Sequence, residues 1–388
     1  MKVLLIEWNS YGNKYMKSLM EERGYHICLF PFDDRKKGED MDTQKRDLLD
    51  ILSSADPFDY VFSYNYFPEV STACNEKKTK YISWVYDSPY LNIYSYTAIN
   101  PVNYIFHFDY GVCSEFETGG IRTVHHLPLG IYGPALSKYS GSRERYDSDI
   151  SFVGSLYNES KHRLYEKFDS ISDYAKGYLD AIILAQKNIY GENILESLIT
   201  PDIESELQKA YPTDPNAPTV MTPAQIYSQF VLSRQVTALE RQEALEMLGK
   251  LGHKNSLYTN VKTVEIFGWE NHGPVDYYEK MPEVFAKSRI NLNITLRSIK
   301  TGIPLRAFDI MGAGGFLLTN YQAEVPEFFI PGEDLAIYES MEDLLTKVEY
   351  YLSHEKERAE IAENGCRKVY EEHNLTKKLD FMEQVAEI

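Results

Sequence analysis

The chain has 388 residues, of which 43% are hydrophobic and 25% charged, and its formal net charge is −18. This composition is typical of a folded globular protein, and the length predicts two domains rather than one. The acidic charge argues against a nucleic-acid-binding protein, which needs a basic surface, and any anionic ligand must meet cations that are gathered locally.

The sequence predicts a cytoplasmic protein. No stretch approaches the roughly 18 consecutive apolar residues of a membrane span, and the N-terminus lacks the pattern of a signal peptide. The four cysteines are widely separated and form no CxxC pair, so we expect reduced thiols and no zinc site. They are Cys28, Cys74, Cys113 and Cys366.

The first part of the chain alternates apolar, strand-like runs with amphipathic, helix-like segments. Helices are expected before Gly24 and over residues 42–54. The expected strands are residues 2–7, 25–30, 58–64, 80–86, 102–108 and 121–126. This alternation predicts βαβ units and a parallel sheet, so we assign residues 1–130 to a Rossmann-like domain and residues 131–149 to a linker.

A second α/β domain is expected over residues 150–365, starting with the strand-like run DISFVG. A helical insertion interrupts it at about residues 160–256, where helix-like stretches flank a proline-rich segment at 211–223. Those stretches are residues 164–171, 181–188 and 231–251. The insertion is either a structural elaboration or a surface for an acceptor or a second copy of the chain, and the sequence leaves both possibilities open.

Alternation resumes after the insertion. The expected strands are residues 263–268, 290–294, 315–319 and 335–338. The expected helices are residues 277–287, 305–311, 341–353, 355–371 and 376–385. We expect residues 366–388 to pack back on the first domain. The fold class is then α/β, with two Rossmann-like domains whose parallel sheets face each other across a cleft.

The most informative stretch is residues 297–316, RSIKTGIPLRAFDIMGAGGF, which follows an expected strand. A helix that starts there exposes unpaired backbone amides and the positive end of its dipole, which suits a phosphate. Three cations gather at this start, namely Arg297, Lys300 and Arg306. Asp309 follows Arg306 by about one helical turn, and its carboxylate can accept the hydroxyls of a ribose. This pattern predicts a nucleoside diphosphate site, against the alternative of a structural helix start with solvated basic residues.

Residues 301–315, TGIPLRAFDIMGAGG, resemble the paired-glutamate motif E-G-F-G-x-x-x-x-E-A-M-A-C-G of retaining glycosyltransferases with the GT-B fold, as in families 1 and 4. Thr301 takes the place of the first glutamate and Asp309 that of the second. The chain is also similar to CgeB-like glycosyltransferases of the spore-maturation-protein type. That similarity rests on the segments DISFVGS (149–155), RAFD (306–309), WVYDSP (84–89) and LPLG (127–130).

The resemblance implies the GT-B fold and a hexosyltransferase-like enzyme that moves a sugar from a nucleoside-diphosphate sugar, with UDP expected, to a glycan or protein. It implies no cofactor and no required metal. Thr301 departs from the motif, because a threonine can only hydrogen-bond the donor sugar as a neutral group, so retention is not carried over. A non-catalytic nucleotide-sugar-binding module, which Thr301 favours, and a nucleotide-sugar epimerase remain alternatives.

The remaining candidates lie next to other expected strands. On the donor side they are glycines and an aromatic residue, namely Gly154, Gly302 and Trp269. On the acceptor side, Asp87 in the aromatic segment WVYDSPY is either a general base for an acceptor hydroxyl or part of an Asx-type turn. His107 and Asp109 are the next candidates for catalysis. The helical insertion is a candidate surface for a homo-oligomer.

Overall fold

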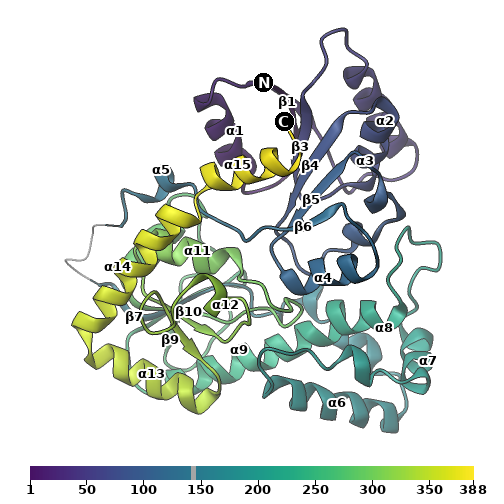
Figure 1. Cartoon of the computed structure of the whole chain (residues 1–388). Coiled ribbons are helices and arrows are strands. Elements are labelled where there is room, and N and C mark those ends of the chain that lie inside the picture. The colour runs from purple at the N-terminus through teal and green to yellow at the C-terminus, as the bar shows by residue number, and fades with distance from the viewer. Residues whose placement is uncertain (141–145) are drawn as a thin grey trace. The chain divides into compact units, whose positions relative to one another are not determined.

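The computed structural model describes residues 1–140 and 146–388, which form two compact units (Figure 1). Unit 1 comprises Met1–Tyr132, Ala217–Val220 and Asn374–Ile388. Unit 2 comprises Gly133–Asn216 and Met221–His373. No helix in the described part of the chain combines the length and the apolar character that a membrane span requires.

Unit 1 is built on a six-stranded parallel sheet with the order β2-β1-β3-β4-β5-β6. Its strands are β1 (Lys2–Glu7), β2 (His26–Pro31), β3 (Tyr60–Tyr64), β4 (Lys80–Val85), β5 (Asn103–His107) and β6 (Val124–His126). Its longer helices are α1 (Asn13–Glu22), α2 (Glu39–Leu52), α3 (Pro68–Lys77), α4 (Tyr110–Thr118) and α15 (Leu375–Val385). The central strands β1, β3, β4 and β5 are buried on both faces because helices cover both sides of such a sheet, whereas the edge strand β2 is largely exposed.

Helix α15 comes from the end of the chain and completes the core of unit 1 (Figure 1). Its buried face carries Leu379 and Met382, and Phe381 meets Phe106 of β5 edge-on with the ring centroids 6.1 Å apart. The hydroxyl of Tyr60 donates to Glu383 at 2.8 Å. Apolar burial and these polar contacts therefore hold the C-terminal helix on the N-terminal sheet.

Unit 2 contains a second six-stranded parallel sheet with the order β12-β11-β10-β7-β8-β9. Its strands are β7 (Ser148–Val153), β8 (Asn255–Tyr258), β9 (Trp269–Asn271), β10 (Ser288–Asn293), β11 (Leu317–Asn320) and β12 (Ala336–Tyr338). Counted along the chain, this is the 3-2-1-4-5-6 order of Rossmann folds. Unit 1 has the order 2-1-3-4-5-6, which is the 2-1-3-4-5 order of flavodoxin-like folds with one strand added. The expected class of two Rossmann-like domains with parallel sheets is confirmed.

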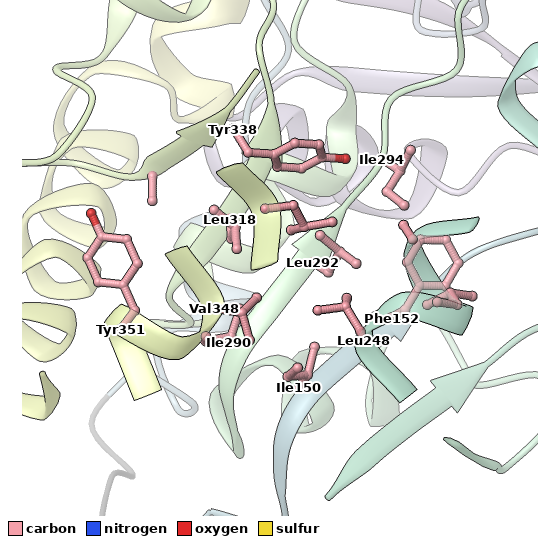
Figure 2. Close-up of a cluster of buried hydrophobic side chains, with 14 of the residues drawn as sticks. Ile150, Phe152, Leu248, Ile290, Leu292, Ile294, Leu318, Tyr338, Val348 and Tyr351 are labelled. Carbon is pink, nitrogen blue, oxygen red and sulfur yellow. The ribbon is translucent and has the colours of Figure 1, made fainter. Parts of the chain in front are cut away.

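The core of unit 2 lies between this sheet and its flanking helices (Figure 2). Strands β7 and β10 contribute Ile150, Phe152, Ile290 and Leu292, each at most 2% exposed. Helices α9 (Ser233–Gly249) and α13 (Met341–Ser353) close over these strands. The helices α10 (Lys280–Ala286), α11 (Leu305–Gly312), α12 (Val325–Phe328) and α14 (Glu355–Glu372) complete the unit.

The strand expected at residues 263–268 is wrong. The structure has β8 before this segment and β9 after it, and residues 263–268 are irregular. Val264 and Ile266 pack against the core without joining a ladder, Phe267 is 78% exposed, and Gly268 has φ +77°. The alternating apolar residues of 263–268 pack an irregular segment against the core and do not form a strand. The actual strand β8 was missed because it has too few residues to show the two-residue period of a strand.

The segment between β7 and β8 is helical. Its main helices are α6 (Asp173–Lys187), α7 (Pro201–Ala210), α8 (Pro223–Ile226) and α9. The hydroxyls of Thr200 and Thr222 cap α7 and α8, and a proline follows each cap at the first helical position. These helices enclose a hydrophobic core of their own, which includes Phe168, Leu179, Leu207 and Tyr227.

Candidate functional site

Each sheet has a topological switch point. It lies between two neighbouring strands whose outgoing connections run to opposite sides of the sheet. In unit 1 it lies between β1 and β3, and in unit 2 between β7 and β10. Open α/β sheets bind ligands outside the carboxyl ends of their strands at this point. The carboxyl ends of β7 and β10 lead to Gly154 and to the loop 294–304, which ends at helix α11. We call this region the carboxyl edge of unit 2.

Helix α11 starts at the carboxyl edge of unit 2 without a side-chain cap. Pro304 is its N-cap residue, with an extended ψ of 152°. The positive end of the dipole of α11 therefore lies at the carboxyl edge, where it suits an anion, although the Ala307 amide already donates to the Pro304 carbonyl at 3.0 Å.

Arg306 and Asp309 lie on this helix. The Arg306 guanidinium lies against the sulfur of Met281 and 5.7 Å from the ring centroid of Phe285. Asp309 is buried, and the hydroxyl of Tyr277 donates to it at 3.4 Å. Burial raises the pKa of the Asp309 carboxyl to about 6, although the charge of Arg306 opposes this rise. Asp309 is thus a buried carboxyl group held beside a cation at the start of the helix.

The raised pKa of Asp309 predicts a pH-dependent stability. Between about pH 4 and about pH 6, Asp309 is protonated in the folded protein and ionised in the unfolded chain. The contribution of this proton to the free energy of unfolding is complete below about pH 4 and is lost as the pH rises through 6. Asparagine does not titrate, so only the wild type loses this contribution. As the pH rises from about 4 to about 6, we expect the free energy of unfolding of Asp309→Asn to increase by about 3 kcal/mol relative to that of the wild type. Urea unfolding between pH 4 and pH 7.5 measures it, and a constant difference between the two proteins would contradict the assignment.

Arg297 is not available at this edge, contrary to the prediction. Its guanidinium is buried and donates to both carboxylate oxygens of Glu240, at 2.8 and 3.0 Å. It also donates to the carbonyls of Ile189 and Lys187 and lies 4.1 Å from the centroid of the Tyr190 ring. Arg297 therefore connects the loop after β10 to the helical segment. Its guanidinium is engaged by these partners and does not face a phosphate site.

Thr301 and Gly302 are held by the loop that follows β11. The Thr301 hydroxyl donates to Glu324 at 2.7 Å, and the Glu324 amide donates back to the Thr301 carbonyl at 3.1 Å. The side-chain amide of Gln322 donates to the Gly302 carbonyl at 3.1 Å. Lys300, beside them, is half-buried. The turn before α11 is thus fixed by polar contacts, and Glu324 places a buried carboxylate next to Thr301, which the sequence did not indicate.

The structure separates the two other donor-side candidates. Gly154 directly follows β7 at the carboxyl edge, and its amide donates to the Tyr258 carbonyl at 2.9 Å. Trp269 is the first residue of β9, so it lies at the opposite, amino edge. Its indole is buried and donates to the Leu245 carbonyl at 2.7 Å, which makes it a core residue. Its prediction as a ligand contact followed from the wrong strand at 263–268.

Sequence reasoning missed other residues at the carboxyl edge of unit 2. Arg241 of α9 donates to the carbonyls of Ser155 and Ile294, which directly follow the carboxyl ends of β7 and β10. Tyr258 ends β8 and stacks on His272, with the ring centroids 4.8 Å apart. No motif marks these residues, because they meet only through the order of the strands.

In unit 1 the acceptor-side candidate Asp87 follows β4 and is exposed. The amide of Asn65 donates to its carboxylate at 2.7 Å, and the oxygen of the same amide accepts from the Tyr86 backbone at 3.2 Å. Asn65 follows β3 at the switch point and has φ +57°. The Asp87 carboxylate is therefore held in place by a residue that follows the neighbouring strand.

His107 and Asp109 are buried at 1% and 0% exposure. Asp109 caps α4 by accepting from the Gly111 amide at 3.1 Å, and His107 Nδ1 accepts from the Asp109 amide at 3.0 Å. Since both side chains hold the start of a helix and are shielded from solvent, we keep Asp87 alone as the proposed base.

A cavity of about 630 Å³ opens at the carboxyl ends of β1 and β2. Its lining includes Glu7, Trp8, Phe32, Asp33, Asp34 and Gln44. The indole of Trp8 donates to the Tyr64 carbonyl at 2.7 Å and so bridges the switch point between β1 and β3. Arg35 and Lys36 also line it, and Arg35 pairs with Asp33 at 2.9 Å. The cavity therefore combines aromatic walls with side chains of both charges at the edge where ligands bind.

Comparisons with known proteins agree with this geometry. Residues 234–384 match a family model described as glycosyl transferase-like. A protein from Aquifex aeolicus (strain VF5), described as uncharacterized, is 25% identical over 122 residues, a match that spans 30% of this chain and only 30% of that relative.

Solved structures resemble the whole chain. Anabaena HepE in complex with UDP and glucose has a TM-score of 0.53 at 10% identity over 100% of both chains. An alpha-glucosyltransferase in complex with UDP and a 13-mer DNA has a TM-score of 0.54 at 8% identity, over 98% of this chain and 99% of that one. Sucrose-phosphate synthase from Thermosynechococcus elongatus has a TM-score of 0.52 at 11% identity, over 99% and 98%. This chain has the GT-B fold.

The GT-B fold agrees with the resemblance found in the sequence, and the match to the glycosyl transferase-like model is confined to residues 234–384. The matched segment runs from α9 to α15 and contains Arg241, Glu240, Arg306 and Asp309. The four cysteines are free thiols, and the described residues contain no group of three or more histidine, cysteine, aspartate or glutamate side chains placed to hold a metal ion.

Proposed function

We propose that this GT-B protein transfers a sugar from a nucleoside-diphosphate sugar, with UDP as the carrier, to a glycan or protein acceptor. The observation that carries the proposal is the glycosyl transferase-like segment 234–384, which contains the uncapped start of α11 with Arg306 and Asp309. UDP is supported by the HepE and alpha-glucosyltransferase structures, both of which are complexes with UDP. The CgeB-like subtype is part of the proposal and rests on the four segments quoted above.

The proposed chemistry needs a stabilised leaving diphosphate. Arg306, Lys300 and the amides at the start of α11 supply positive charge where the diphosphate departs, so that no metal is required. Asp309, once ionised, accepts the ribose hydroxyls. Fixed donors of this kind lower the barrier because they are oriented before the reaction starts.

On the acceptor side, the proposed base is Asp87, which would take the proton from an acceptor hydroxyl in an inverting reaction. The cavity beside β1 and β2, with its aromatic walls and charged side chains, suits a sugar, whose apolar faces pack on rings and whose hydroxyls bond charged groups.

The Asp87→Asn variant tests this division of roles. Because the amide retains the hydrogen-bonding shape but not the basicity, we expect sugar transfer to fall about 100-fold or more, while the affinity for UDP stays unchanged. Transfer assays and UDP titration of both proteins measure this. Unchanged transfer would remove Asp87 from the reaction, and lost UDP binding would show that it acts on the donor instead.

Thermal unfolding with a panel of nucleoside diphosphates and their sugars, in the presence of EDTA, tests the proposed function. A ligand at about 100 times its dissociation constant adds roughly 2.7 kcal/mol to the stability, which is easily seen. Stabilisation by UDP without metal, followed by acceptor-dependent UDP release, is the expected result. Binding without turnover would indicate a sensor, product formation from the nucleotide sugar alone an epimerase, and no stabilisation by any nucleotide would contradict a donor site.

A further inference from the structure

Two arginines are buried in unit 2 beside the carboxyl edge, and they differ in their partners. Arg297 forms a two-bond ion pair with Glu240, the residue that precedes Arg241 on α9. Arg241 is 8% exposed and forms no ion pair within the described part of the chain. Its Nη1 donates to the Ser155 carbonyl, its Nη2 donates to the Ile294 carbonyl, and its buried Nε has no hydrogen-bond partner.

The carboxylates nearest to Arg241 are engaged elsewhere. Both oxygens of Glu159 accept from the Ser155 hydroxyl at 2.8 Å, and Glu240 is occupied by Arg297. The Arg241 guanidinium otherwise faces the rings of Tyr157 and Phe152, at 4.9 and 5.4 Å from their centroids. A cation that is buried with carbonyls and rings alone costs folding free energy, because these groups replace only part of its hydration.

This cation lies at the switch point itself. Ser155 comes two residues after β7 and Ile294 directly after β10, so the guanidinium bridges the two strands between which the switch occurs. A Cβ atom placed on Gly154 would lie 3.7 Å from Arg241 Nη1, so the charge is in van der Waals contact with this turn. Ligand phosphates bind at such turns, and in a medium of low dielectric constant a buried charge acts on them over several ångströms.

We propose that Arg241 is a positioning residue for the donor diphosphate. The diphosphate supplies a negative charge, and the described residues of the folded protein form no ion pair with this guanidinium. Arg241 holds the Gly154–Ser155 turn against β10, and its buried charge makes the electrostatic potential at that turn more positive. Arg306 contributes positive charge separately, at the start of α11. This inference rests on the proposed function, and it adds a second source of positive charge, from the opposite side of the switch point.

The test compares uridine, UMP and UDP, which differ only in their number of phosphates, and adds inorganic pyrophosphate, which lacks the nucleoside. Each is titrated in EDTA into wild type, Arg241→Met and Arg241→Lys. We expect Arg241→Met to bind UDP at least 30-fold more weakly and uridine unchanged, because it lacks the charge that acts on phosphates. Arg241→Lys should retain most of the preference for UDP over uridine. Without ligand, Arg241→Met loses two hydrogen bonds to carbonyls but also removes a buried charge, so its stability should stay close to that of the wild type.

The outcomes separate this inference from the proposed function. If UDP and pyrophosphate bind wild type and Arg241→Met equally well, Arg241 is purely structural. The same conclusion follows if Arg241→Met is less stable and binds both uridine and UDP more weakly by the same factor. If Arg241→Met does not fold, a folded Arg241→Lys that loses the preference for UDP overturns the inference. If none of the four ligands binds the wild type, the proposed donor site and this inference fall together.

Discussion

Replacing Arg306 by alanine should weaken UDP binding by about 30-fold, because a charge-assisted contact to a phosphate contributes roughly 2 kcal/mol. The loss of kcat/KM for sugar transfer should be larger, about 100-fold or more, since the charge on the departing diphosphate grows in the transition state. Arg306 is half-buried and lies against Met281 and Phe285, so its removal should change the unfolding temperature of the free protein little. UDP titration and initial rates for both proteins measure the two effects.

Arg367→Ala is the matched control for this prediction. Arg367 is an exposed arginine on α14 of the same unit and donates only to Asn364. Its removal changes the net charge of the protein by the same amount, so it corrects for long-range electrostatics. Equal losses of UDP affinity in the two variants would mean that overall charge, and not the start of α11, attracts the donor.

Replacing Glu240 by alanine should destabilise the protein by about 3–5 kcal/mol, the usual loss when one partner of a buried ion pair is removed. Glu240 is 0% exposed, and its removal leaves the Arg297 guanidinium buried with only the carbonyls of Ile189 and Lys187. Because Arg297 lies in the loop before α11, we also expect weaker UDP binding. Urea unfolding of both proteins measures the stability.

Glu243→Ala on the same helix is the control. Glu243 pairs with Lys187 at 2.5 Å, but its side chain is 38% exposed, so the variant should lose less than about 1 kcal/mol. The double variant Glu240→Leu with Arg297→Met should recover much of the stability lost in Glu240→Ala, because it removes both buried charges. A loss in Glu240→Ala no larger than in Glu243→Ala would contradict the buried pair.

The fold could be predicted from sequence because most strands are uninterrupted apolar runs. Each of β1, β3, β4 and β5 is buried on both faces and separated from the next by a helix, so the alternation is visible residue by residue. Strands β8 and β9 have only four and three residues. Strand β8 pairs with β7, which lies about a hundred residues earlier, and β9 pairs with β8. Nothing local distinguishes Asn255–Tyr258 from the end of a helix, whereas the irregular segment at 263–268 imitates a strand.

The candidate site could be predicted only in part. Helix α11, with Arg306 and Asp309 on one turn, is a local pattern and lies where the sequence placed it. Arg297 has the same local signal, but its partner Glu240 is 57 residues away, so the sequence could not reveal that its charge is engaged. Arg241 sits within ERQEALE, a run whose charges resemble a solvated helix face, yet the structure buries it. Tertiary partners decide which cations remain for a ligand.

Hydrogen exchange with and without UDP, in EDTA, tests the central claim that the donor diphosphate binds at the carboxyl edge of unit 2. The account predicts that UDP slows amide exchange in two segments that are far apart in sequence, namely residues 154–156 after β7 and residues 300–309 at the start of α11. Both effects should weaken in Arg306→Ala. Protection confined to unit 1 or to the helices α6 to α8, or none at saturating UDP, would contradict it.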